Sequence, residues 1–156
     1  MPETVKRIVA RVVAGLGYRA GQASNWYKDF AQLIHVVGLQ KSRWGGDRYL
    51  ETGVWLKAFG PDERPKYYEC HVRLRLATGC GLDLGEIDSA LREDDFGRMD
   101  QEERRRLIGG ALKLAEADFF GRARNLIDLR SLLTDSRSLE LAVDKRVREL
   151  LRLPGA

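Results

Sequence analysis

Two histidines and two cysteines are the residues of this 156-residue chain best suited to bind a metal or to act as a nucleophile and its base. Cys70, His71 and Cys80, together with His35, have the ligand types that zinc prefers. Cys70 and His71 are adjacent in an expected strand, however, and neighbouring strand residues point to opposite faces of a sheet. Because their side chains point to opposite faces, Cys70 and His71 cannot form a catalytic Cys–His pair. Such a pair would be possible only if Cys70 met His35 from the neighbouring strand. We therefore expect no metal and no cofactor, and we expect Cys70 to be a small buried hydrophobe.

Motifs that position phosphates or nucleophiles are absent from the sequence. It has no Gly-Lys-Ser/Thr phosphate loop and no Gly-x-Ser-x-Gly nucleophile elbow. Carboxylates gather at 93–95 and at 100–103, where a pair could bind a divalent ion or serve as acid and base. Both clusters lie near expected helix starts, where the helix dipole alone favours acidic residues. The sequence thus predicts no catalytic residue and favours a protein that is not an enzyme.

Apolar residues recur with helical or strand spacing along the chain. Helices are predicted over 4–15, 86–92, roughly 18 residues after Asp100, 123–133, and a last segment capped by Asp135 or Ser136. Strands are predicted over 25–29, 32–41, 48–58 and 68–76, with a tight turn at Gly45-Gly46 between the second and third.

Strands in the first half and helices in the second predict an α+β fold. We expect one domain over residues 1–156, with an antiparallel sheet of about four strands (residues 25–77) covered mainly on one face by an N-terminal helix and C-terminal helices. The strand at 25–29 is expected at the sheet edge, where it could pair with a second copy in a dimer. The last helix is expected to turn Leu139, Ala142, Val143, Val147 and Leu150 toward the core.

The alternation in the third and fourth strands assigns their side chains to two faces. The apolar set, which includes Leu50, Val54, Cys70 and Leu74, is expected to face the core. The opposite face is expected to carry Tyr49, Glu51, Trp55, His71, Arg73 and Arg75. Three interpretations stay open: a partner-binding surface, an exposed face with cross-strand Glu51–Arg pairs, or a face on which the C-terminal helix covers Trp55.

Charge is distributed unevenly along the chain, whose formal net charge is +4. The first 80 residues carry 13 Lys and Arg against 7 Asp and Glu, a difference of +6, and the remainder carries 14 against 16, a difference of −2. A basic first half raises affinity for acidic partners or phosphates. No stretch approaches the roughly 18 apolar residues of a membrane span. Because the opening residues do not form a signal peptide and the cysteines are few, we expect a cytoplasmic protein without membrane association.

One part of the sequence resembles a known family. The residues that carry the resemblance are Leu16-Gly17-Tyr18, Trp26-Tyr27, the run from Val36 to Gly46 that contains Gln40-Lys41-Ser42, and the run from Tyr49 to Trp55. They resemble a bacterial family catalogued as domain of unknown function 4304, over about residues 5–76. The family has no assigned catalytic residue, so the resemblance implies none here. Small proteins of this type are sometimes toxin-neutralising or adaptor modules, by analogy only.

These observations favour a non-catalytic protein-binding module of the adaptor or toxin-neutralising type. One alternative is nucleic-acid or phosphate-ligand binding through the basic half of the chain, and another is an enzyme with a site near the Gln40–Ser42 hairpin. The candidate binding residues are Gln40, Lys41, Ser42, Arg43, Trp44, Tyr49, Glu51, Trp55, His71, Arg73 and Arg75.

Overall fold

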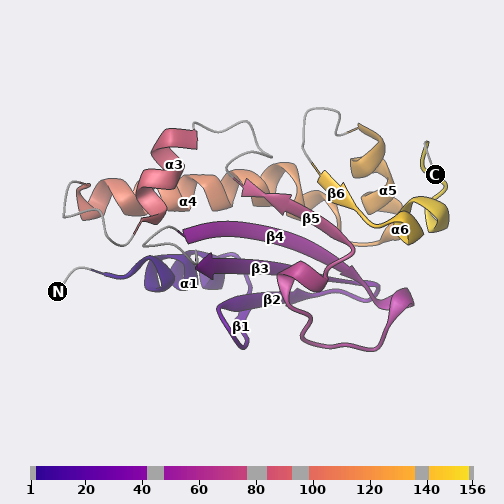
Figure 1. The fold of residues 1–156 in the computed structure, drawn as a ribbon. Helices are drawn as coiled ribbons and strands as arrows, with labels where there is room; N and C mark the ends of the chain where they lie inside the picture. Colours follow the sequence, from indigo (N-terminus) through magenta and orange to yellow (C-terminus); the bar gives the residue numbers. More distant parts are fainter. Residues whose placement is uncertain (1–2, 42–47, 77–83, 93–98, 136–140, 155–156) are drawn as a thin grey trace.

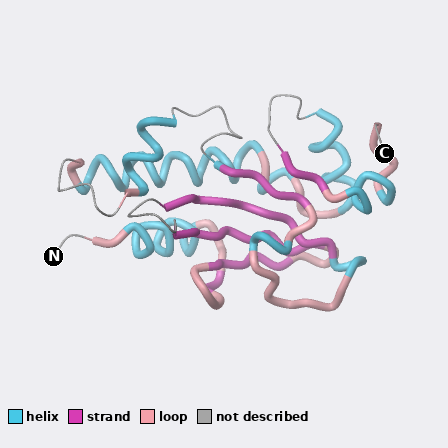
Figure 2. The backbone as a smooth tube through the Cα atoms, in the orientation of Figure 1, coloured by secondary structure: helices cyan, strands magenta, loops and turns pink. Residues whose placement is uncertain are grey.

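The computed structural model describes residues 3–41, 48–76, 84–92, 99–135 and 141–154 (Figures 1 and 2). The helices are α1 (Val5–Gly15), α3 (Leu84–Leu91), α4 (Gln101–Asp118), α5 (Leu126–Asp135) and α6 (Lys145–Leu150), with three short 3-10 turns, η1 (Lys57–Phe59), η2 (Tyr67–Glu69) and η3 (Phe120–Arg122). The strands are β1 (Arg19–Ala20), β2 (Asn25–Asp29), β3 (Leu33–Lys41), β4 (Arg48–Leu56), β5 (Val72–Arg75) and β6 (Leu141–Val143). The strands form one antiparallel sheet in sequence order. The α+β class is confirmed, with six strands where about four were predicted.

The main core lies between the sheet and the helices. In Figure 1 the helices lie behind and above the sheet. Helix α1 begins at Thr4, whose hydroxyl accepts a hydrogen bond from the Arg7 N–H at 3.2 Å and so caps the first turn. Four residues of its apolar stripe, Val5, Ile8, Val9 and Val13, are fully buried, whereas Val12 and Leu16 are partly buried. Helix α4 confirms the predicted 18-residue helix. Asp100 occupies its N-cap position, although its side chain makes no capping hydrogen bond.

A second, smaller core forms on the opposite face of the sheet. The connection between β4 and β5, residues 57–71, folds across this face and passes in front of the strands in Figure 1. The cluster contains Tyr27, Ile34, Val36, Tyr67 and Cys70, with Trp55 packed against it.

Two glycines in the central strands allow this close approach. A Cβ atom added at Gly38 would lie 2.6 Å from the Tyr67 ring, and one added at Gly53 would lie 2.7 Å from the Cys70 Cβ. Real side chains do not pack at such distances, so the connection can lie this close only over glycine. The Cys70 side chain therefore belongs to the second core, and its predicted place in the main core is wrong.

The strand predicted over 68–76 begins only at Val72. Residues 67–69 form the turn η2, in which the Lys66 N–H donates to the Glu69 carboxylate at 2.9 Å. The alternation in the sequence continues through a segment whose backbone is not a strand. Side-chain assignments before residue 72 therefore fail, and this change affects both Cys70 and His71.

The C-terminal segment also differs from the prediction. Residues Leu141–Val143 form the edge strand β6 on β5, and α6 begins after Asp144, whose carboxylate accepts from the Arg146 N–H at 2.8 Å. Val147 is fully buried as predicted, whereas Ala142 is exposed and Leu150 is 44% exposed. The last helix was predicted to begin near 135, and Leu139 lies outside the described residues.

Strand β2 is not the edge of the sheet. It pairs with β3 on one side and with the two-residue strand β1 on the other, through Arg19 opposite Tyr27 and Ala20 opposite Trp26. The predicted edge at 25–29 is therefore wrong. A dimer formed by pairing residues 25–29 of two copies was predicted on the basis of this edge, and the structure does not support that basis.

Substituting the glycines under the 57–71 connection tests the second core. Gly38→Ala and Gly53→Ala should each lower the free energy of unfolding by about 1–3 kcal/mol, since the added methyl overpacks the cluster. Gly110→Ala is the matched control. It lies in α4 with nothing within 4 Å of an added Cβ, so it should raise stability by about 0.5–1 kcal/mol through helix propensity. Urea unfolding measures all three, and equal effects at the three positions would contradict the close approach.

Candidate functional site

The uncovered part of the second face, beside η2 at the hairpin end of β3 and β4, brings together most of the predicted binding residues that the structure describes. We call it the basic-aromatic surface. It consists of Gln40, Tyr49, Glu51, Lys66, Tyr68, Arg73 and Arg75. The predicted binding residue Lys41 does not belong to it, because Lys41 lies opposite Arg48 and shares the sheet face of Leu39 and Leu50. Gln40 lies opposite Tyr49 across β3 and β4, and Glu51 lies opposite Arg75 across β4 and β5. Three of its side chains are cationic and one is acidic, and the Glu69 carboxylate lies next to Lys66.

Glu51 and Arg75 form a cross-strand ion pair at the centre of this surface. The Arg75 Nε and Nη2 donate to Glu51 Oε1 at 3.0 and 2.9 Å. The Arg75 guanidinium also lies 4.7 Å from the Tyr49 ring centroid, within the range of a cation–π contact. The Glu51 side chain is only 10% exposed, whereas that of Arg75 is 47% exposed. The predicted Glu51–Arg pairing is confirmed, and it compensates the one acidic charge of the surface.

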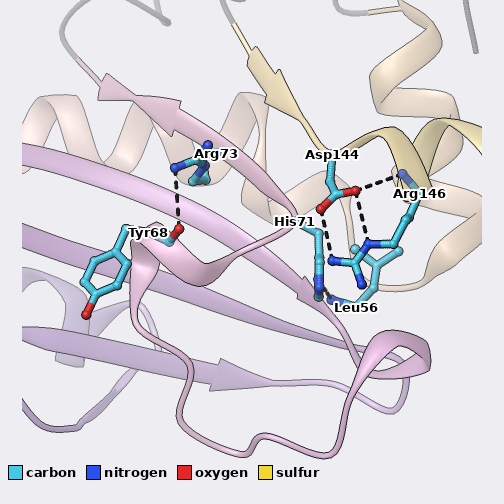
Figure 3. A network of polar contacts seen from close by, with 6 residues as sticks. All are labelled: Leu56, Tyr68, His71, Arg73, Asp144 and Arg146. Atoms are coloured by element: carbon cyan, nitrogen blue, oxygen red, sulfur yellow. Dashed lines mark hydrogen bonds and ion pairs between the residues drawn. The ribbon is translucent and has the colours of Figure 1, made fainter.

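Arg73 and Tyr68 lie exposed next to this pair. Arg73 Nη1 donates to the Tyr68 carbonyl oxygen at 3.4 Å, as Figure 3 shows. Tyr68 is 51% exposed, the only tyrosine among the large exposed hydrophobic side chains of the described residues. Arg73 makes no ion pair with another described residue. A cation and an aromatic ring are therefore both available to a partner here.

A hollow of about 380 Å³ adjoins the surface on the β2 side. Its lining residues are Ala23, Ser24, Asn25, Leu39, Gln40, Lys41, Lys66, Tyr67 and Tyr68. A hydrogen bond with the Tyr68 side chain raises the pKa of Lys66, and the nearby Glu69 carboxylate raises it further. The described lining of the hollow holds no carboxylate, histidine or cysteine.

Asn25 fixes the loop that forms one wall of this hollow. Its side-chain amide donates to the carbonyl oxygens of Gln22 and Ala23 at 3.1 and 3.0 Å, and its Oδ1 accepts from the Tyr67 N–H at 3.1 Å. Asn25 is only 4% exposed. Ala23 and Ser24 both have left-handed backbone conformations, with φ of 53° and 58°. Non-glycine residues seldom adopt this conformation, so the loop is held in its shape by contacts around it.

A larger hollow, of about 550 Å³, lies at the other end of the same face. Its charged lining residues are Arg19, Lys57, Arg64, Asp29, Asp62 and Glu63, three of each sign. Lys57 and Asp29 pair with each other at 2.8 Å. The formal charges of this lining therefore cancel.

The match to a family model covers residues 9–115, which span most of α1, the strands β1 to β5 and most of α4. The model describes a domain of unknown function, DUF4304. The chain belongs to this family. All residues of the basic-aromatic surface lie within the matched region, whereas β6 and α6 lie outside it. No curated protein and no solved structure matches the chain.

Trp55 and His71, two predicted surface residues of this DUF4304 chain, are packed side chains. His71 is 3% exposed, and its Nδ1 accepts from the Leu56 N–H at 3.0 Å (Figure 3). Its ring lies 4.4 Å from that of Trp55 and 5.0 Å from that of Phe59. Burial lowers the pKa of His71, and the nearby Arg146 guanidinium lowers it further. His71 therefore does not belong to the binding surface as predicted.

Trp55 is half-buried beneath the 57–71 connection, and its Nε1 donates to the Gly60 carbonyl oxygen at 3.4 Å. It is covered by this connection and not by the C-terminal helix that one interpretation proposed. A segment that follows directly in sequence therefore accounts for the burial of this tryptophan.

His35 lies in the main core of the DUF4304 domain, on the face opposite Cys70. It is fully buried, its Nε2 donates to the Ala123 carbonyl oxygen, and its ring lies 4.7 Å from that of Phe30. Burial lowers the pKa of His35 to about 4. Burial raises the pKa of the Cys70 thiol. The two side chains lie in different cores, and the described residues include no group of three or more potential metal ligands.

Several predicted residues lie outside the described part of the chain: Ser42, Arg43, Trp44, Cys80 and the acidic run 93–95. The structure adds Ser24, Asn25, Lys66 and Tyr68 to the site. Lys66 and Tyr68 lie in the run Pro65-Lys66-Tyr67-Tyr68, in which the proline is typical of a turn. The alternation of residues 68–76 instead predicted a strand there, and the turn η2 was missed. Among the described helices, none is long and apolar enough to cross a membrane.

The buried His35 should make the domain less stable in acid. Because its folded pKa of about 4 lies below the ordinary value of 6.5, the unfolded chain takes up a proton between these values. Its contribution should be complete above pH 6.5 and should fall by about 3 kcal/mol as the pH drops to 4. Urea unfolding from pH 7 to pH 4 measures this loss. His35→Asn, which keeps a donor for Ala123, should show a smaller loss over that range, and an identical pH slope in both proteins would rule out the assignment.

Proposed function

We propose that this protein is a non-catalytic binding module that holds an acidic segment of a protein partner on the basic-aromatic surface. The observation that carries the proposal is the charge of that surface, where Lys66, Arg73 and Arg75 stand against Glu51, an acid that is already paired. Charge complementarity of this kind favours an acidic partner and increases its association rate. The exposed Tyr68 ring adds the apolar contact area that hot spots in interfaces use.

Two further statements belong to the proposal. An adaptor or toxin-neutralising role would use such a surface, because both act by holding another protein. We also place the protein in the cytoplasm, where the buried Cys70 thiol would stay reduced.

Nucleic-acid binding is the second candidate, because Arg73 and Tyr68 could contact a phosphate and stack on a base. Glu51 interrupts the cations of the surface, so they do not form the continuous track that an extended phosphate backbone follows. Binding to nucleic acid would also weaken steeply with salt.

Fluorescence anisotropy with two labelled probes tests the proposal. The first is a peptide of eight glutamates and the second is a single-stranded thymidine oligonucleotide of matched charge. We expect the peptide to bind more tightly, and Arg73→Ala to weaken it by about fivefold, close to 1 kcal/mol. Lys113→Ala, an exposed lysine of α4 that is not part of the surface, removes the same charge and should change the affinity less than twofold.

Equal losses in the two variants would mean that net charge alone attracts the peptide, and the surface would be rejected. Tighter binding of the oligonucleotide, weakened by Arg73→Ala, would replace the protein partner with nucleic acid.

A further inference from the structure

We infer that the larger hollow of the second face binds a small zwitterion, a molecule that carries one carboxylate and one ammonium group, as a free α-amino acid does. The inference concerns the hollow of about 550 Å³ beside the 57–71 connection. It goes beyond the proposed function, because this hollow shares no lining residue with the basic-aromatic surface. All of its lining residues lie in the described part of the chain, and its volume is in the range of small-molecule sites.

The sheet forms the floor of this hollow. Arg19 of β1 lies opposite Tyr27 of β2, and Asp29 of β2 lies opposite Ile34 of β3. Residues directly opposite each other in antiparallel strands share a face, and so do residues two apart in one strand. Tyr27 and Ile34 belong to the second core, so the side chains of Arg19 and Asp29 point to the same face. The strand register therefore places the Arg19 guanidinium on the side of the sheet where the hollow lies.

The 57–71 connection supplies the rest of the lining, through Lys57 and residues 60–64. The Tyr27 hydroxyl donates to the Arg64 carbonyl oxygen at 3.3 Å, so this ring reaches from the sheet to the connection. Burial raises the pKa of Tyr27, the Asp62 carboxylate raises it further, and the Arg64 guanidinium lowers it. Both charged groups therefore lie near the Tyr27 hydroxyl, and the hollow has charges of both signs close to one aromatic ring.

Most of these charges are not paired with one another. Lys57 and Asp29 form an ion pair at 2.8 Å. The other charged lining residues form no ion pair with a described residue: Arg19, Asp62, Glu63 and Arg64. The Asp62 carboxylate is instead held by the backbone, since its Oδ1 accepts from the Arg64 N–H at 3.0 Å. Two guanidinium groups and two carboxylates thus remain available to a ligand in one hollow.

This balance of charges selects between kinds of ligand. A simple anion that approached the guanidinium groups would also meet the two carboxylates, and a simple cation would meet the two guanidinium groups. A zwitterion can pair each of its charges with the opposite charge of the lining. Charge complementarity contributes more to specificity than to affinity. We therefore expect modest affinity with a strict requirement for both charges of the ligand.

Hydrogen bonds hold the lining in place before a ligand arrives. Lys57 Nζ donates to the Phe30 carbonyl oxygen at 2.6 Å in addition to its ion pair with Asp29. The Trp55 Nε1 donates to the Gly60 carbonyl oxygen at 3.4 Å and ties the connection to β4. A site whose walls are fixed in advance loses less entropy when it binds.

Amide chemical shifts of the isotope-labelled protein test the inference. The common α-amino acids are added one at a time at millimolar concentration. We expect at least one of them to move the signals of Ala20, Gly60 and Glu63 in a saturable way. Two derivatives of that amino acid then separate its charges, because the N-acetyl form lacks the ammonium group and the C-terminal amide lacks the carboxylate. Each derivative should bind about tenfold more weakly or worse.

Charge variants locate the binding. Arg19→Gln removes a guanidinium from the floor, and Asp62→Asn/Glu63→Gln removes both unpaired carboxylates. Each variant should weaken the amino acid by about tenfold. The matched controls are Arg7→Gln in α1 and Glu102→Gln/Asp118→Asn in α4, which remove the same charges from exposed positions on helices. The controls should change the affinity by less than about twofold.

Three results would overturn the inference. The first is the absence of a saturable shift with every amino acid, and the second is binding that withstands the loss of either ligand charge. The third is an equal loss of affinity in the site variants and their controls. Because the peptide of eight glutamates is expected on a different part of the face, any of these results would leave the proposed function standing.

Discussion

The contact of Tyr67 and Cys70 with the two sheet glycines, Gly38 and Gly53, is the constraint on which the rest of the second face depends. Any side chain at either glycine would meet the 57–71 connection at less than 3 Å. Because the connection lies flat, it creates a second core from residues of β2, β3 and β4. It also borders both hollows of this face, the one at Lys57 and Arg64 and the one at Lys66 and Tyr68. The position of the turn η2 thus determines which side chains a partner can reach.

The same constraint explains which residues of the predicted surface are retained. Tyr49, Glu51, Arg73 and Arg75 lie beyond the reach of the connection and stay on the face that their strand positions require. Trp55 lies beneath it, and its indole is tied to Gly60 by a hydrogen bond. Removing Trp55 and His71 from the exposed set leaves a surface that is more basic and less apolar than the sequence suggested. Such a surface is better suited to an acidic segment than to a large hydrophobic interface.

The sequence predicts those helices and strands in which the spacing of apolar residues fits only one kind of secondary structure. The stripes of α1 and α4 are long and amphipathic, and β2, β3 and β4 are bounded by turn residues, so their positions follow from local pattern. Residues 68–71 continue the alternation of β5, yet residues 67–69 form the 3-10 turn η2. Only the contacts of Tyr67 and Cys70 with Gly38 and Gly53 distinguish this turn from a longer strand. Strand β6 has three residues, and its pairing with β5 depends on segments more than 60 residues apart in the chain. The role of Asn25 could not be predicted, because its partner Tyr67 is 42 residues away.

Among the described residues, both histidines and Cys70 are turned toward the interior. Burial lowers the pKa of His35 to about 4, lowers that of His71 and raises that of the Cys70 thiol. At neutral pH these groups are therefore uncharged, and each is packed in a core or hydrogen-bonded to the backbone. The basic-aromatic surface instead presents arginines, whose charge does not change over the physiological range. The free energy of unfolding should consequently depend on pH through the buried histidines. The proposed binding of an acidic segment should depend on salt concentration and on the positions of the surface cations.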